Sequence, residues 1–410
     1  MSEKSPPKLL VQNTALPHIS ITSSYSFKQF LHNFCIVFIF SRNIILHQLC
    51  NLITLSIMPS SHTQQGPKTG TGKTVLITGG SGYVAAHVLN SFLSRGYHVR
   101  TTVRSQSSAE KIKQSHKKYI DQLSFAIVED VATPGAHDEA VKGVDGVIHT
   151  ASPFQMTVTS NKTDLLDPAI NGTLSLLTSI QAHNPHIKRV LITSSFAAIL
   201  DLSLGTRPGY TYTESDWNPI SYTEAADQKT PGPVAYCASK TFAERAAFDF
   251  VKEKKPNFEI TSVCPPMVYG PAAHTVSSLS NLNTSSADIY RLMNGSTKSV
   301  PETSFYAFVD VRDLGEAHVL AYESEKAAGQ RYLIASGGYT YQQVCDVIRK
   351  GFPEKRELVP EGEEGSAFPD VYGIDNGKVR RELGLEFRGL EESIGDMVRE
   401  FIEIEKRVGA

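Results

Sequence analysis

Three side chains of this sequence have the chemistry to reduce a carbonyl group together: Ser195, Tyr236 and Lys240. A serine hydroxyl can donate a hydrogen bond to the carbonyl oxygen, and a phenol can supply the proton as negative charge develops there. A free phenol has a pKa of about 10, and we expect the Lys240 ammonium to lower the pKa of Tyr236 by favouring the phenolate. The ammonium could also hold the ribose hydroxyls of a nicotinamide cofactor. In the reverse direction, the phenolate would be the base for oxidation of an alcohol.

Tyr236 and Lys240 are four residues apart, so they share one face of the helix predicted over residues 234–252. This pair alone is weak evidence, because the same spacing is common on exposed helices. Ser195 comes from elsewhere, just after a strand predicted over residues 189–193. The interpretation therefore requires a fold that brings a strand end to a helix face, with a cofactor site beside both.

Residues 74–87 predict that cofactor site. An apolar run indicates a buried strand, a glycine turn follows at Gly79, Gly80 and Gly82, and helical spacing begins at the next residue. The start of a helix offers unpaired N–H groups to a pyrophosphate, and glycines let the backbone approach it. The spacing Gly-x-x-Gly-x-x-Ala ends at Ala85 and is a variant of the dinucleotide fingerprint. The alternative is an ordinary corner between a strand and a helix.

Arg104 favours NADPH as the cofactor. It follows a strand predicted over residues 97–103, about 20 residues past the glycines, where NAD enzymes tend to place an acidic residue for the ribose 2′-hydroxyl. A guanidinium with hydroxyl neighbours suits a 2′-phosphate instead. The alternative is a solvated arginine at a strand end. Ser107, with Glu110 three residues later, predicts the start of the following helix.

Further strands, predicted over residues 124–128, 144–149 and 258–264, alternate with helices. This alternation predicts an α/β fold with a doubly wound parallel sheet, whose ligands lie beyond the carboxyl ends of the strands. Residues after these strands are therefore candidates for the adenine, for close backbone approach and for the carboxamide end of the cofactor. The predicted cofactor-binding residues are Thr78, Gly79, Ser81, Gly82, Tyr83, Val84, Arg104, Asp130, Val131, Thr150, Ala151, Ser152, Tyr236, Lys240, Pro265 and Val268.

The overall composition excludes some function classes. A formal net charge of -2 over 410 residues gives no support to nucleic-acid binding. The hydrophobic fraction of 40% and charged fraction of 20% are typical of a globular protein. The five cysteines show no metal-like spacing, so no metal is expected and a reducing, cytoplasmic compartment is the simplest interpretation. We expect a small-molecule substrate, no membrane partner, and a monomer or homodimer.

Residues 1–71 form an N-terminal extension that we predict to be poorly ordered. Glu3 is its only acidic residue, and its longest apolar run, residues 34–40, is well short of the 18 or so residues that span a membrane. The extension could be a mis-called stretch before a natural start at Met58, a targeting segment, or a peripheral anchor.

The chain resembles the extended short-chain dehydrogenase/reductase family, also called the NAD-dependent epimerase/dehydratase superfamily. The shared motifs are Thr78-Gly79-x-x-Gly82-x-x-Ala85, Asp130-Val131, Ser194-Ser195 and Tyr236-x-x-x-Lys240. Three further stretches, residues 147–154, 266–271 and 308–313, are similar to the branch of dihydroflavonol 4-reductases, cinnamoyl-CoA reductases and NADPH-dependent methylglyoxal and ketone reductases. The resemblance implies a catalytic triad of Ser195, Tyr236 and Lys240, NADPH as hydride donor, and a Rossmann fold with a smaller C-terminal lobe.

This resemblance covers roughly residues 72–406 and sets the predicted domain organisation. Residues 72–270 are expected to be mainly dinucleotide-binding and residues 271–410 mainly substrate-binding, with residues 304–335 returning to the core. Phe154, Phe196, Met267 and Tyr269 could line an apolar substrate cleft, or could equally be core packing. The lysine- and glutamate-rich residues 252–255 are expected to be solvated surface.

Three other functions stay open from the sequence. A nucleotide-sugar epimerase or dehydratase is disfavoured by Arg104, and by Ala169 at a slot where many relatives carry an asparagine. A non-catalytic dinucleotide sensor would typically have lost the pair of Tyr236 and Lys240. A membrane-attached sterol-type dehydrogenase would use residues 34–57 as its anchor.

Overall fold

The structure is a computed structural model, and it describes residues 68–152, 158–273, 276 and 278–409. All of them fall within one compact unit, Gln65–Ala410. The predictions for residues 1–67 and for Phe154 lie outside the described residues.

A parallel sheet of seven strands forms the centre of the described part of the chain, in the order β10-β7-β5-β4-β1-β2-β3. Each neighbouring pair is parallel. The chain order reverses between β1 and β4, which is the switch point where such sheets bind ligands. The fold prediction is therefore confirmed. The strands are β1 (Thr74–Thr78), β2 (His98–Val103), β3 (Leu123–Ile127), β4 (Gly146–His149), β5 (Arg189–Thr193), β7 (Glu259–Cys264) and β10 (Arg331–Leu333).

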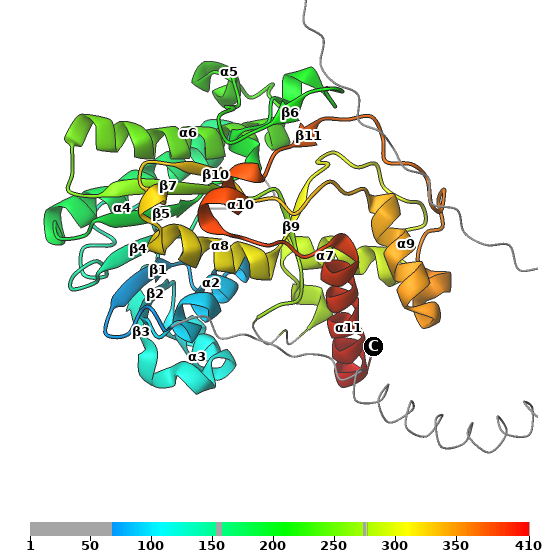
Figure 1. Cartoon of the computed structure of the whole chain (residues 1–410), viewed down its shortest axis with the longest axis horizontal. Coiled ribbons are helices and arrows are strands. Elements are labelled where there is room, and N and C mark those ends of the chain that lie inside the picture. The colour runs from blue at the N-terminus through cyan, green and yellow to red at the C-terminus, as the bar shows by residue number, and fades with distance from the viewer. Residues whose placement is uncertain (1–67, 153–157, 274–275, 277, 410) are drawn as a thin grey trace, which may run out of the picture. The chain divides into compact units, whose positions relative to one another are not determined.

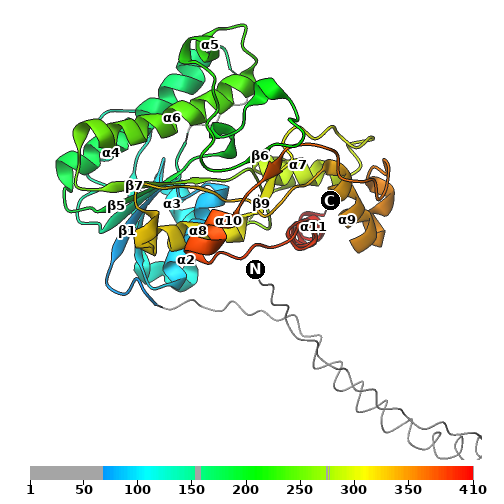
Figure 2. The same cartoon turned by 45° about the horizontal axis from the view of Figure 1, so that its top comes forward.

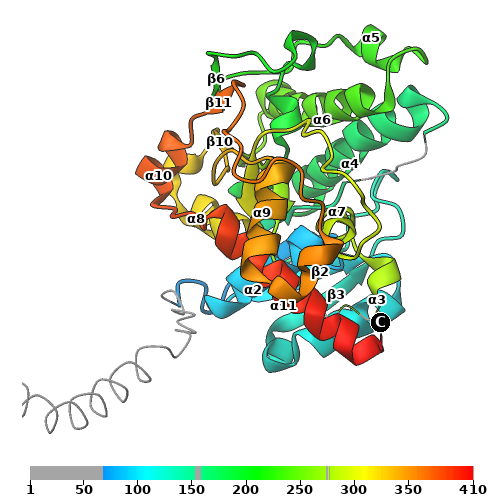
Figure 3. The same cartoon turned by 90° about the vertical axis from the view of Figure 1, so that its right-hand side faces the viewer.

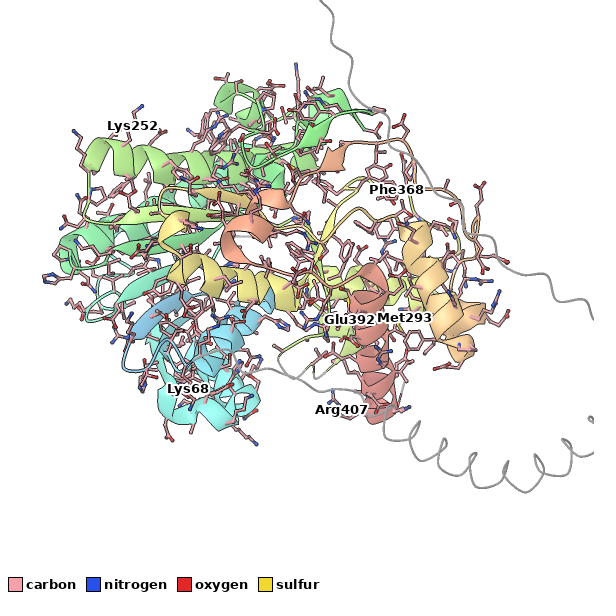
Figure 4. The ribbon with its side chains drawn as sticks, viewed as in Figure 1. Lys68, Lys252, Met293, Phe368, Glu392 and Arg407 are labelled. Carbon is pink, nitrogen blue, oxygen red and sulfur yellow. The ribbon has the colours of Figure 1, made fainter. Side chains whose placement is uncertain are left out.

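Helices cover both faces of this sheet (Figures 1 and 2). Helices α2 (Tyr83–Ser94) and α8 (Val311–Glu323) pack together on one face, and α4 (Asp167–His183) and α6 (Gly232–Lys254) on the other. The central strands are apolar and almost wholly buried, as a sheet covered on two sides requires. Lys252, near the end of α6, projects away from the sheet (Figure 4), and residues 252–255 are exposed as predicted.

A smaller C-terminal lobe surrounds a second apolar cluster (Figures 1 and 3). Its three main helices contact one another and carry most of that cluster. They are α7 (Thr284–Met293), α9 (Tyr341–Gly351) and α11 (Leu390–Val408). Smaller elements are β6 (Thr211–Tyr212), α5 (Tyr222–Ala226), β8 (Met267–Tyr269), β9 (Phe308–Asp310), β11 (Gly373–Ile374) and α10 (Gly377–Leu383). Strands β8 and β9 pair with each other, outside the central sheet.

One helix start was predicted wrongly. Helix α3 spans Gln106–Ser115, and its N-cap is Ser105, whose hydroxyl accepts a hydrogen bond from the backbone N–H of Ser108. The predicted cap, Ser107, lies inside the first turn. Ser105 and Ser107 could each have capped this helix. Ser105 does so because its backbone is extended just after β2, as an N-cap residue requires.

Candidate active site

The glycine turn after β1 has no room for side chains. Gly79 adopts φ +72°, and a Cβ there would lie 3.0 Å from the Cβ of Ala151. A Cβ on Gly80 would lie 2.1 Å from Thr101 Oγ1. Gly82 is the N-cap residue of α2, which begins at Tyr83. The turn therefore presents a helix N-terminus and close backbone to the switch point, as the fingerprint predicts.

Thr78 joins the ends of β1 and β4. Its hydroxyl oxygen accepts hydrogen bonds from the backbone N–H groups of Thr150 (3.1 Å) and Ala151 (3.0 Å), and lies 2.9 Å from His149 Nδ1. Burial lowers the pKa of His149 to about 3, so its ring is neutral near pH 7. Because the Thr78 oxygen already accepts two hydrogen bonds, its proton is best directed to His149 Nδ1. The Thr78 side chain is fully buried, so it acts by holding the backbone of Thr150 and Ala151 in place.

A cleft of ≈ 410 Å³ opens beyond these strand ends. It contains most of the predicted cofactor-binding residues, and the cleft also has lining residues that the sequence analysis missed. The predicted ones are Gly79, Ser81, Gly82, Arg104, Asp130, Val131, Thr150, Ala151 and Ser152. The missed ones are Thr102, Val103, Val128 and Glu129. The missed residues are the last two of β2 and the first two after β3. Counting the two residues before Arg104 and the two before Asp130 as candidates would have found them.

At one side of this cleft, Arg104 is exposed beside a group of serine hydroxyls. Ser105 Oγ lies 2.9 Å from Ser107 Oγ and 3.1 Å from Ser108 Oγ, at the start of α3. The first turn of α3 has no acidic residue. A guanidinium, hydroxyls and the positive end of a helix dipole together suit a phosphate group.

Asp130 lies at the same cleft with its carboxylate turned partly to its own backbone. It accepts hydrogen bonds from the N–H of Ala132 (2.9 Å) and from Thr133 Oγ1 (3.2 Å). It is exposed, so it keeps capacity to accept from another donor.

Several predicted cofactor residues do not line the cleft. The Tyr83 side chain is buried, and its hydroxyl donates to the carbonyl oxygen of Gly270 at 2.6 Å. Val84 lies in α2 and is partly buried against the core. Val268 lies in β8, opposite Val309. Pro265 is buried, and its carbonyl accepts from the N–H of Phe196 at 2.8 Å. Their roles toward a cofactor stay predictions.

Lys240 and Tyr236 share one side of α6, as their spacing predicts. Lys240 Nζ lies 5.2 Å from the centroid of the Tyr236 ring and donates to Ser152 Oγ at 2.5 Å. Burial lowers the pKa of Lys240 to about 8, because desolvation disfavours the ammonium. Ser152 therefore joins α6 to the ≈ 410 Å³ cleft.

The prediction that Lys240 lowers the pKa of Tyr236 is not confirmed by the structure. The pKa of Tyr236 is raised to about 12, chiefly by burial and in addition by Cys237. Desolvation disfavours the phenolate, and Lys240 is not among the groups that shift this pKa. Tyr236 is consequently a neutral phenol near pH 7, the protonation state that an acid requires.

Ser195 starts a short 3-10 turn, Phe196–Ala198, directly after β5. Its hydroxyl oxygen accepts from the N–H of Ala197 at 3.1 Å, which leaves its proton for another acceptor. The turn packs against α6.

A cavity of ≈ 20 Å³ lies between α6 and the ends of β4 and β5. Lys240, Ser152 and Ser194 line it, and so does Glu244, one helical turn beyond Lys240. Ala169, at the position where many relatives carry an asparagine, lines it too. The structure thus brings Lys240 together with the residue before Ser195, and it adds Glu244, which sequence reasoning missed although it continues the same helix face.

Two of the residues considered for the substrate cleft belong to the core. Phe196 is fully buried, with its ring centroid 5.8 Å from both Tyr212 and Tyr372. Tyr269 is fully buried and hydrogen-bonds to Asp288. Met267 is partly buried and packs on the core of the C-terminal lobe.

Two searches of the described residues bear on other kinds of site. They contain no group of three or more His, Cys, Asp or Glu side chains placed to hold a metal ion. Within the same part of the chain, every helix is too short or too polar to cross a bilayer.

Comparison with known proteins places this site in a family. A model of the NAD dependent epimerase/dehydratase family matches residues 75–335. The ketoreductase azaE of Aspergillus niger is 40% identical over 340 residues, which cover 81% of this chain and 98% of that protein. The NADPH-dependent methylglyoxal reductase GRE2 of Saccharomyces cerevisiae is 33% identical over 345 residues, which cover 82% and 99%.

A solved structure agrees with these relatives. The crystal structure of yeast methylglyoxal/isovaleraldehyde reductase Gre2 complexed with NADPH matches with a TM-score of 0.76 at 32% identity, covering 82% of this chain and 99% of that one. The family resemblance and the fold predicted from the motifs are confirmed.

Proposed function

This chain belongs to the NAD dependent epimerase/dehydratase family, and we propose that it is an NADPH-dependent reductase that converts an aldehyde or ketone into an alcohol. One observation carries the proposal: Ser152 lines the ≈ 410 Å³ cleft and also accepts the hydrogen bond of Lys240. The dinucleotide cleft and the tyrosine–lysine pair are therefore parts of one site.

The residues present fit NADPH. Gly79, Ser81 and Gly82 line the cleft directly before α2 begins, so close backbone and the N-terminus of that helix face it. We assign the pyrophosphate to the N-terminus of α2, and the 2′-phosphate to Arg104 with the neighbouring serine hydroxyls. Asp130 would accept from the adenine amine. When bound, NADPH supplies the hydride that the carbonyl carbon receives.

In this mechanism the chain's own residues handle the oxygen and the proton. The Ser195 hydroxyl donates to the carbonyl oxygen, whose negative charge grows as the carbon is reduced. Tyr236, a neutral phenol near pH 7, gives its proton to that oxygen. The Lys240 ammonium, whose Nζ lies 5.2 Å from the centroid of the Tyr236 ring, would stabilise the resulting phenolate and would hold the ribose hydroxyls of the cofactor.

NADPH oxidation by the full chain, followed over a panel of α-dicarbonyls, aryl ketones and flavanonols, tests the proposal. We expect turnover with NADPH on at least one class, with NADH a poor substitute. Binding of NADPH without turnover across the panel would favour a non-catalytic sensor. Tightly held NAD⁺ in the purified protein would favour an epimerase or dehydratase.

The proposals for location and assembly rest on the sequence alone. We propose a cytoplasmic enzyme acting on a small carbonyl compound, as a monomer or a homodimer. Fractionation of the full chain beside a chain that starts at Met58 tests the location.

A further inference from the structure

The catalytic groups of the proposed reductase come from two separate elements. Ser195 follows β5, whereas Tyr236 and Lys240 lie on α6. Turnover depends on the distance between these elements, since a misplacement of about 1 Å can cost a large factor in rate. Some contact must therefore fix the end of β5 against α6.

Ser194 and Glu244 make that contact. The Ser194 hydroxyl donates to Glu244 Oε2 at 2.6 Å. Ser194 directly precedes Ser195, and Glu244 lies one helical turn beyond Lys240. The backbone N–H of Ser194 donates to the carbonyl of Val263 at 2.8 Å, which holds the same residue to β7. Ser194 is thus anchored on both sides, to the sheet by its backbone and to the catalytic helix by its side chain.

The Glu244 carboxylate is itself held rigidly. It is 2% exposed, and Arg331 at the start of β10 donates to it from Nε at 2.7 Å and from Nη2 at 3.2 Å. The thiol of Cys264 lies 3.6 Å from Oε1. A buried carboxylate with this set of donors keeps one orientation.

Arg331 is fixed in turn by the loop before α5. Its Nη1 donates to the carbonyl oxygens of Glu214 (2.5 Å) and Asp216 (2.7 Å). Its guanidinium stacks on Trp217, 3.6 Å from the ring centroid. Because Trp217 is the only tryptophan of the chain, its emission reports on this arginine.

We propose that Ser194 and Glu244 are positioning residues: the buried pair of Glu244 and Arg331 holds Ser194, and through it sets Ser195 against Tyr236 and Lys240. The proposal rests on the reductase function proposed above. A competing explanation is a core ion pair that only stabilises the fold. The two differ in what loss of the Ser194 hydroxyl alone does, because the ion pair survives that loss.

The test is Ser194→Ala in the full chain. We expect kcat to fall about tenfold, while the Kd for NADPH and Trp217 emission stay unchanged. In a Ser195→Ala background, Ser194→Ala should cause no further loss, because the two residues act as one unit. Unchanged turnover in the single variant, or an equal further loss in the Ser195→Ala background, would overturn the proposal.

Ser179→Ala is the matched control. Ser179 is also a buried serine that donates to a carboxylate at 2.6 Å, but its partner is Asp138 and it lies on α4 outside the site. We expect it to leave kcat unchanged, and a tenfold loss there too would show that the effect is not specific. If Ser195→Ala leaves turnover intact, the proposed reductase mechanism fails; if Ser195→Ala lowers turnover while Ser194→Ala leaves it unchanged, only the positioning role fails.

Discussion

The hydrogen bond from Lys240 to Ser152 predicts how turnover depends on pH. The pKa of Lys240 is lowered to about 8, so the lysine is charged below that pH and loses its proton above it. In the proposed mechanism, reduction needs the ammonium, which stabilises the phenolate left by Tyr236. We therefore expect kcat for reduction to fall about tenfold per pH unit above an inflection near pH 8.

Removing the Ser152 hydroxyl should move that inflection to lower pH. A hydrogen bond to a charged donor is worth roughly 1.5–3 kcal/mol, and we take about 1.4 kcal/mol because Ser152 is exposed and water can replace it in part. Since about 1.4 kcal/mol corresponds to one pKa unit, the charged form loses about one unit. Ser152→Ala should thus shift the inflection from about 8 to about 7.

The assay is kcat at saturating NADPH and substrate between about pH 5.5 and 10, a range that brackets both the shifted and the unshifted pKa. Ser81→Ala is the control, because Ser81 lines the same cleft, whereas the hydrogen bond of Lys240 goes to Ser152. It should leave the inflection near 8 even if NADPH binds more weakly. An inflection that stays in place or rises in Ser152→Ala would refute the assignment of Lys240 as the titrating group.

Three further changes test the site. Arg104→Ala should raise the Kd for NADPH by roughly 10- to 100-fold and leave the Kd for NADH nearly unchanged, and titration with both cofactors decides this. Tyr236→Phe should lower kcat by about 10²- to 10⁴-fold, because the proton donor is lost, with the Kd for NADPH within about twofold; equal loss of both would contradict its role. Gly80→Ala should destabilise the fold by roughly 1–3 kcal/mol, because its Cβ would meet Thr101 Oγ1 at 2.1 Å; an unchanged melting temperature would show that this turn tolerates a side chain.

Local pattern made much of this protein predictable. The apolar runs, the glycine turn and the helical spacing of Tyr236 and Lys240 depend on neighbouring residues, and the corresponding strands and helices appear within a few residues of their predicted bounds. The motifs also indicated the family. Arg104 was predictable as a cleft residue, because parallel strands bring their carboxyl ends to one edge of the sheet.

The environment of Tyr236 and Lys240 was decided by the tertiary structure. Lys240 donates to Ser152, 88 residues away in the chain, and Arg331 pairs with Glu244 across 87 residues. No local spacing encodes such contacts, since they depend on how the helices cross the sheet. The pKa of Tyr236 shows the same limit, because the sequence shows a nearby lysine but not how deeply the phenol is buried. The sequence by itself thus determined which residues are available and on which elements, whereas desolvation and long-range packing, which exist only in the folded chain, decided their protonation states and their partners.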